Sequence, residues 1–197
     1  GELENAFCAV RPPGHHATRN KAMGFCFFNN VAVAAKYALQ RHNLQRVAVI
    51  DFDVHHGNGT EDILAGDERA LMCSFFQHPF YPYSGDQNPA PNMCNVPVPA
   101  YSKGMDIREV VEMMWIPRLE EFQPEMMFIS AGFDAHREDD MGQLGLTEQD
   151  FSWITQRLKD VARRYCNGRI VSCLEGGYIP SALARSVEAH LRVLADV

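Results

Sequence analysis

Short apolar runs alternate with longer amphipathic segments along this chain of 197 residues. The runs show little internal alternation of apolar and polar residues, which is typical of strands that are buried on both faces of a sheet. The predicted strands cover residues 6–10, 47–52, 70–75, 126–131 and 169–174. The predicted helices cover residues 29–40, a short segment that begins near Thr60, and residues 106–122, 147–165 and 180–195. This order predicts a single α/β domain with a mainly parallel central sheet and helices on both faces.

Two local signals mark the ends of the fourth predicted helix. Thr147 is followed three residues later by Asp150, which is the spacing of a capping box, and Gly168 lies just after the helix as a stop signal. The segment 77–103 differs from the rest because it contains six prolines, and it is predicted to be a long irregular loop. Loops of this length in compact domains are usually functional.

The charge balance limits the kinds of partner that the chain can bind. Lys and Arg number 18 and Asp and Glu number 25, and the net charge of -7 argues against a dedicated nucleic-acid binder and suits a basic substrate better. No apolar run approaches the roughly 18 residues of a membrane span, and the start of the chain does not resemble a signal peptide. We therefore expect a cytoplasmic protein without membrane or nucleic-acid partners. Its six cysteines form no C-x-x-C pair and are expected to be free, mostly buried thiols.

Polar side chains follow four of the predicted strands. They lie at residues 11–16, 53–59, 132–136 and 175–178. Because open α/β sheets bind ligands beyond the carboxyl ends of their strands, we expect these four loops to converge on one edge.

Asp51, Asp53 and His55 are spaced two residues apart, which directs alternate side chains of an extended chain to one side. Two carboxylates and an imidazole suit a borderline divalent cation such as zinc, and Asp134 from another strand end can add an oxygen. A set of Asp53, His55 and Asp134 leaves a coordination position open, as a catalytic zinc site requires, and leaves Asp51 for a second role.

Other interpretations of these residues are less favourable. A calcium loop beginning at Asp51 would need glycine at the position of His56 and glutamate at the position of Asp62. A lone His-His pair is usually accidental, but two pairs at strand ends beside three aspartates favour a site. From the residues alone, Gly176 and Gly177 can equally form a tight turn, and Tyr178 can equally be a core aromatic.

Five segments together resemble the zinc-dependent histone deacetylase family, and most closely its class II and bacterial members, which include acetylpolyamine amidohydrolases. They are RPPGHHA (11–17), GFCFFNN (24–30), DFDVHHGNGT (51–60), SAGFDAH (130–136) and LEGGY (174–178). The resemblance spans nearly the whole chain. It implies a three-layer arginase/deacetylase-like fold and a hydrolase that removes acetyl or other acyl groups from lysine side chains or related amines such as polyamines.

The resemblance also implies a role for individual residues around a catalytic zinc ion. Asp53, His55 and Asp134 would hold the zinc. His15 and His16 would flank the reacting water.

In the same resemblance, Asp51 orients His15 and Asn58 orients His16. Tyr178 would donate its hydroxyl to the developing oxyanion. A structural potassium ion would be held by Asp51, Ser74 and the backbone carbonyls of Asp53, His55 and Phe75.

The implied substrate-binding residues surround a narrow tunnel for an extended alkyl chain. Gly24 would offer its carbonyl to the substrate amide, Phe25 and Tyr81 would form the walls, and Met141 would lie at the rim. Gly176 and Gly177 belong to the same implied substrate-binding set.

The chain departs from the family pattern at a few positions. Phe76 stands where many relatives carry histidine, and Asp140 precedes Met141 where proline is common, so we expect the rim and the substrate preference to differ. Relatives also have a substantial segment before the RPPGHH motif. Residues 1–197 are therefore expected to be a histone deacetylase-like catalytic domain that lacks its N-terminal portion, and the oligomeric state is not predicted.

Two alternative functions stay open at this point. An arginase-type ureohydrolase with two manganese ions shares the expected sheet topology, and Asp134-Ala135-His136 resembles its signature, but Arg137 and Glu138 are not the expected continuation. A catalytically inactive acyl-lysine binding domain is the other alternative, because a fold does not guarantee its chemistry.

Overall fold

The structure is a computed structural model, and it describes residues 3–197. These residues form one six-stranded sheet in the order β1-β6-β5-β2-β3-β4, and every neighbouring pair is parallel. The strands are β1 (Asn5–Cys8), β2 (Val47–Asp51), β3 (Ala70–Gln77), β4 (Met93–Val98), β5 (Met126–Ala131) and β6 (Ile170–Leu174). The helices are α1 (Asn30–Arg41), α2 (Asn58–Leu64), α3 (Gly104–Val110), α4 (Ile116–Phe122), α5 (Glu148–Tyr165) and α6 (Pro180–Ala195).

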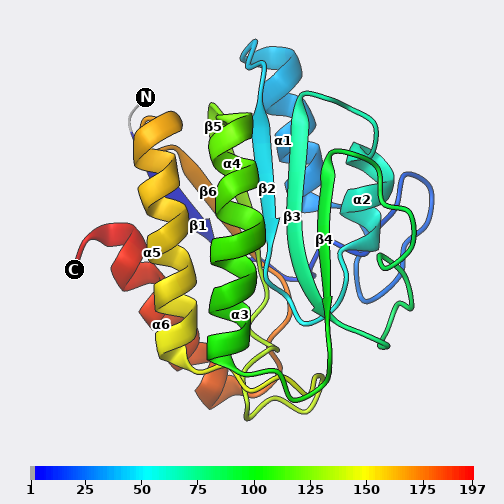
Figure 1. The fold of residues 1–197 in the computed structure, drawn as a ribbon, viewed down its shortest axis with the longest axis vertical. Coiled ribbons are helices and arrows are strands. Elements are labelled where there is room, and N and C mark those ends of the chain that lie inside the picture. The colour runs from blue at the N-terminus through cyan, green and yellow to red at the C-terminus, as the bar shows by residue number, and fades with distance from the viewer. Residues whose placement is uncertain (1–2) are drawn as a thin grey trace.

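Helices cover both faces of this sheet, as Figure 1 shows, with α3, α4 and α5 in front and α1 and α2 behind. Each face has its own core. The front core includes the fully buried Phe52, Trp115 and Phe151, and the rear core includes Val31 and Met72. The predicted parallel sheet between two helical layers is confirmed.

The prediction that residues 77–103 form only an irregular loop is wrong, because this segment contains β4. Strand β4 lies at the edge of the sheet, where its Pro97 is opposite Phe76 in the register. Proline is tolerated on an edge strand because its missing N–H removes no bond from the interior of the sheet. The edge position also explains why only part of the strand is buried, so its apolar run is too short to stand out in the sequence.

The predicted helix 106–122 is one continuous helical segment with an internal irregularity. α3 and α4 are joined by a π-helical turn at Val111–Trp115. Pro117 follows this turn in the first positions of α4. Proline has no N–H to donate to the carbonyl four residues earlier, and its ring clashes with that carbonyl, which disturbs regular α-helical geometry. The capping box at the start of α5 is confirmed, since the Asp150 carboxylate accepts hydrogen bonds from the Thr147 N–H at 2.9 Å and from its hydroxyl at 2.8 Å.

The order of the strands reverses between β2 and β5, and this places the site. From β2 the chain continues to its neighbour β3 and then to β4, whereas β5 lies on the opposite side of β2 and leads to β6. In open parallel sheets such a reversal leaves a crevice beyond the carboxyl ends of the two strands. The loops after β2 and β5 carry the predicted metal ligands, so they meet at this crevice.

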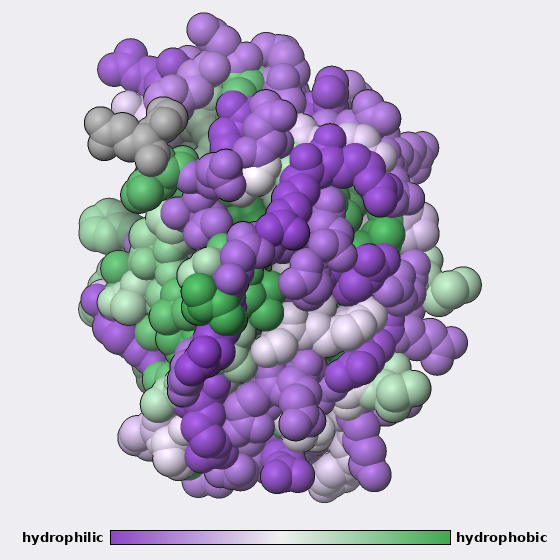
Figure 2. Space-filling model, turned by 90° about the vertical axis from the view of Figure 1, so that its left-hand side faces the viewer, coloured by the Kyte–Doolittle hydropathy of each residue, from purple (hydrophilic) through white to green (hydrophobic). Residues whose placement is uncertain are grey.

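The β1 edge of the sheet carries apolar surface. All four residues of β1 are only half-buried, and Leu3 and Val10 beside it are exposed. Figure 2 views the molecule from this side and shows hydrophobic residues gathered on this face.

The structure also bears on two expectations drawn from composition. The six cysteines are all free, and all except the half-buried Cys8 are buried, as predicted. Among residues 3–197, no helix combines the length and the apolar character that crossing a bilayer needs.

His190 on α6 is a fully buried histidine whose environment predicts a loss of stability in acid. Thr155 Oγ1 donates to the Phe151 carbonyl at 2.6 Å and therefore accepts from His190 Nδ1 at 2.7 Å, while Ser172 Oγ lies 2.9 Å from Nε2 and can donate to it. The ring is thus satisfied in its neutral form, and burial lowers its pKa from 6.5 to about 3. Because the unfolded chain binds this proton more readily, the contribution of His190 is complete above pH 6.5 and is lost as the pH falls toward about 3.

We expect the free energy of unfolding of His190→Asn to depend less on pH than that of the wild type. The difference in slope should approach about 1.4 kcal/mol per pH unit below pH 6.5, since one proton is involved. Urea unfolding followed by circular dichroism between pH 8 and pH 4.5 measures both slopes. His42→Asn, at an exposed histidine, is the control for removing a histidine without removing a buried one. Equal slopes for His190→Asn and the wild type would contradict the prediction.

Candidate active site

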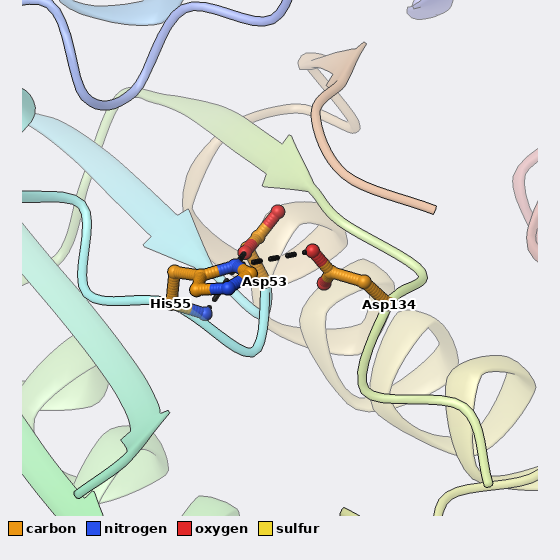
Figure 3. A group of neighbouring side chains, drawn as sticks. All are labelled: Asp53, His55 and Asp134. Atoms are coloured by element: carbon orange, nitrogen blue, oxygen red, sulfur yellow. Dashed lines mark hydrogen bonds and ion pairs between the residues drawn. The ribbon is translucent and has the colours of Figure 1, made fainter. Parts of the chain in front are cut away.

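Asp53, His55 and Asp134 form a compact group of potential metal ligands at the crevice (Figure 3). Asp53 and His55 follow β2, and Asp134 follows β5. One ligand atom from each residue lies within 4.8 Å of the others, and all three side chains are buried. His55 Nδ1 lies 2.9 Å from Asp53 Oδ1 and 3.2 Å from Asp134 Oδ2.

The chemistry of this group fits a divalent cation. Burial and the charge of Asp53 raise the pKa of Asp134 to about 6, and Asp134 Oδ2 is buried without a hydrogen bond. Burial opposes a charge on His55, but the carboxylates of Asp134 and Asp53 outweigh it and raise its pKa to about 10. The three side chains therefore favour a positive charge between them, and two carboxylates with one imidazole are donors that zinc accepts.

Gly176 is required beside these ligands because the chain passes very close to them. Its N–H donates to Asp53 Oδ2 at 2.8 Å, and a Cβ at this position would overlap Asp134 Oδ2. Gly177 has φ of 127° and its carbonyl accepts from Arg11 at 2.8 Å. Gly176 therefore contacts the metal-ligand candidates, and Gly177 contacts Arg11 next to Tyr178.

The histidine pair is held by the two partners that the resemblance implies. His15 Nδ1 lies 2.9 Å from Asp51 Oδ2, and His16 Nδ1 lies 2.8 Å from Asn58 Oδ1. The environments of the two rings differ. Burial opposes the charge of His15, but Asp51 and Asp53 raise its pKa well above 6.5, whereas burial and the charge of His15 lower the pKa of His16 to about 3.

A cavity of about 570 Å³ opens next to the ligand group. Its lining consists of His16, Gly24, Phe25, His55, Phe80, Tyr81, Asp140, Met141 and Tyr178. The structure thus brings together all four predicted residues of the tunnel and rim. Phe80 was not predicted to line the cavity. Its ring stacks on His55 with ring centroids 5.4 Å apart. Its position next to Tyr81 in the sequence could have indicated this role.

Tyr178 enters the cavity from the loop after β6, and two residues hold it there. Its N–H donates to Asp139 Oδ2 at 2.7 Å, and the Arg11 guanidinium lies 5.6 Å from its ring centroid. Burial and then the charge of Asp53 raise the pKa of its hydroxyl, so the group stays a hydrogen-bond donor. Sequence reasoning gave neither Arg11 nor Asp139 a role, although Arg11 belongs to a recognised motif.

The residues predicted for a potassium site lie behind the histidine pair. Asp51 and Ser74 are opposite each other in the register of β2 and β3, and both are fully buried. Asp51 Oδ1 accepts from the Asp53 N–H at 3.1 Å, and Ser74 Oγ lies 3.3 Å from the Phe75 carbonyl oxygen. The structure thus places Asp51 and Ser74 beside each other on neighbouring strands.

Comparison with known proteins agrees with this geometry. Residues 1–194 match the sequence model of the histone deacetylase domain. The chain belongs to the histone deacetylase family. It is 41% identical to type-2 histone deacetylase 2 of Dictyostelium discoideum over 97% of this chain and 12% of that protein. It is 39% identical to a histone deacetylase-like amidohydrolase of Pseudomonas aeruginosa over 90% of this chain and 49% of that protein.

The fold comparison gives the same result for this histone deacetylase family member. The crystal structure of the HDA15 HD domain superposes with a TM-score of 0.93 and 37% sequence identity. The match covers 100% of this chain and 57% of that chain. The chain therefore spans little more than half of the solved domain, and the predicted arginase/deacetylase-like fold is confirmed.

Proposed function

We propose that this protein is a zinc-dependent amidohydrolase that removes acetyl or other acyl groups from lysine side chains or related amines. One observation carries the proposal: the ligand group Asp53, His55 and Asp134 adjoins a cavity that His16 and Tyr178 also line. The family membership supports it, as do relatives named histone deacetylases and a deacetylase-like amidohydrolase. Residues 1–197 then form a histone deacetylase-like catalytic domain.

Asp53, His55 and Asp134 would hold the zinc ion, with His55 binding through the Nδ1 atom that faces both carboxylates. Zinc held there supplies Lewis acidity, which polarises a carbonyl and makes water acidic near neutral pH. Asp51, Ser74 and the backbone carbonyls of Asp53, His55 and Phe75 would hold a structural potassium ion.

In the proposed reaction, His16 would transfer protons and His15 would stabilise charge. His16 lines the cavity, and its Nδ1–H bond to Asn58 leaves Nε2 without that proton and able to accept one from the attacking water. The same nitrogen can then return the proton to the leaving amine. His15 does not line the cavity; its ring lies 4.1 Å from that of His16 and its charge is held by Asp51, so it would stabilise negative charge in the transition state.

The other lining residues would bind and orient the substrate. Phe25 and Tyr81 form apolar walls that suit an extended alkyl chain, and the Gly24 carbonyl can accept from the amide N–H. Tyr178 can donate its hydroxyl to the developing oxyanion. The net charge of -7 is compatible with cationic acylated amines.

A panel of acetyl-lysine peptides, trifluoroacetyl-lysine peptides and acetylated polyamines, assayed with measured metal content, tests this proposal. We expect about one zinc per chain and zinc-dependent release of the acyl group from at least one class. Two manganese ions per chain and urea production would instead support the ureohydrolase alternative. Zinc binding with no release from any substrate would support an inactive acyl-lysine binding domain.

The geometry favours the one-metal enzyme over the ureohydrolase. Within residues 3–197, the only group of three or more potential ligands with ligand atoms this close is Asp53, His55 and Asp134. Asp51, a further carboxylate beside the histidine pair, is bonded to His15. This arrangement supports a single catalytic ion.

A further inference from the structure

Glu175 is a fully buried acid that none of the roles above uses. It follows β6 and is held in place by the bond from its own N–H to the Ala131 carbonyl at 2.9 Å. Its Oε2 accepts hydrogen bonds from the N–H groups of Gly14 at 2.6 Å and His15 at 3.1 Å. Its Oε1 accepts from Ser130 Oγ at 2.9 Å.

These bonds fix one of three points by which His15 is held. The His15 N–H donates to Glu175, while its carbonyl accepts from the N–H groups of Gly59 and Thr60 at 3.0 and 3.1 Å. The ring is the third point, through Asp51. A residue that is fixed at its N–H, its carbonyl and its ring has little freedom to turn, which is the condition for a preorganised site.

Glu175 also connects the two sides of the site. The next residue, Gly176, donates to the metal-ligand candidate Asp53 at 2.8 Å, and Tyr178 follows two residues later. The loop that carries His15 is separated from Glu175 by 160 residues in the sequence. The Glu175 side chain therefore ties the loop of His15 to the loop after β6, which contacts Asp53 and carries Tyr178.

We propose that Glu175 is a positioning residue, whose side-chain oxygen holds the Gly14–His15 backbone and so places the His15 ring against Asp51 and the metal ligands. This inference rests on the proposed function for its effect on turnover. The length of the Glu175 side chain matters for this role, and its charge does not. The role requires only an acceptor oxygen at the point where the N–H groups of Gly14 and His15 converge.

Two substitutions separate reach from charge. Glu175→Gln keeps the length and an acceptor oxygen, and its amide can donate to Ser130 Oγ, so we expect kcat within about threefold of the wild type. Glu175→Asp keeps the charge but is one carbon shorter, by about 1.5 Å. A displacement of this size near the reacting groups is expected to lower kcat by about 10- to 100-fold with KM and zinc content little changed.

A second readout does not depend on turnover. The His15 Nδ1–H proton, which faces Asp51, gives an imidazole resonance that His15→Asn assigns by its absence. We expect this resonance at its wild-type shift in Glu175→Gln and shifted or lost in Glu175→Asp. Lys159→Met is the control for lost stability alone, because Lys159 Nζ caps the Val193 and Leu194 carbonyls at the C-terminal end of α6; it should lower Tm and leave kcat and the resonance unchanged.

The outcomes are distinguishable. A folded Glu175→Gln that loses kcat or the resonance overturns the inference, as does a Glu175→Asp that retains both. This holds even if Glu175→Asp fails to fold, since Glu175→Gln alone can then contradict it. If the wild type releases no acyl group from any substrate, the proposed function fails, while the resonance comparison still decides whether Glu175 places His15.

Discussion

Replacing Tyr178 with phenylalanine is expected to lower kcat by about 10²- to 10³-fold while KM changes little. The ring would still pack beside Phe25 and under Arg11, so the cavity keeps its shape. Only the hydroxyl is lost, and its high pKa makes it a donor to an oxyanion that exists in the transition state and not in the bound substrate. Loss of one such donor commonly costs about 3 to 4 kcal/mol.

Steady-state kinetics with the preferred acylated substrate measure this effect. Tyr83→Phe is the matched control, because Tyr83 is exposed and does not line the cavity. It should leave kcat and KM unchanged. Unchanged turnover in Tyr178→Phe, or an equal effect on binding and turnover, would count against the role assigned to the hydroxyl.

Replacing Asp134 with asparagine is expected to remove most of the bound zinc and to lower activity by at least about 10³-fold. The change keeps the size of the side chain but removes one of two carboxylate ligands, leaving Asp53 and His55. The fold should be retained, since Asp134 Oδ1 accepts from the Val54 N–H at 3.0 Å and an amide oxygen can do the same. Asp134 Oδ2 lies 3.2 Å from His55 Nδ1, and the amide cannot form an ion pair with a charged His55, so we expect the Tm of the metal-free Asp134→Asn to fall modestly.

Metal analysis after dialysis and the Tm of the metal-free protein test the two parts of this prediction. Asp67→Asn is the control, because Asp67 pairs with Lys36 and Arg69 away from the cavity. It should retain about one zinc per chain. Full zinc content and wild-type activity in Asp134→Asn would show that the ligand group is assigned wrongly.

Much of the fold was predictable because a segment that is buried in the fold has a recognisable pattern of apolar residues in the sequence. Strands β2, β3, β5 and β6 are covered on both faces, so they read as continuous apolar runs, and β5 and α6 have the predicted bounds. Strand β4 has no such pattern because it lies at an edge and contains Pro97. The spacing of Asp53 and His55 was also legible, because residues two apart in an extended segment point to the same side.

The pairing of distant residues could not be predicted in the same way. Periodicity shows that β2 and β5 are buried strands but not that they are neighbours, and only that neighbourhood brings Asp134 within 3.2 Å of His55. The roles of Arg11 and Asp139 around Tyr178 depend on similar long-range contacts.

The sequence by itself determined the α/β architecture and, through its five motifs, the family and the types of residue at the site. Only the tertiary structure decided that His16 faces the cavity while His15 lies behind it, and that Glu175 holds the His15 backbone. The physical reason is that local composition and spacing report which side chains are buried or extended. Hydrogen bonds and charges that select one histidine from an adjacent pair come from residues far away in the chain, and folding alone brings them together.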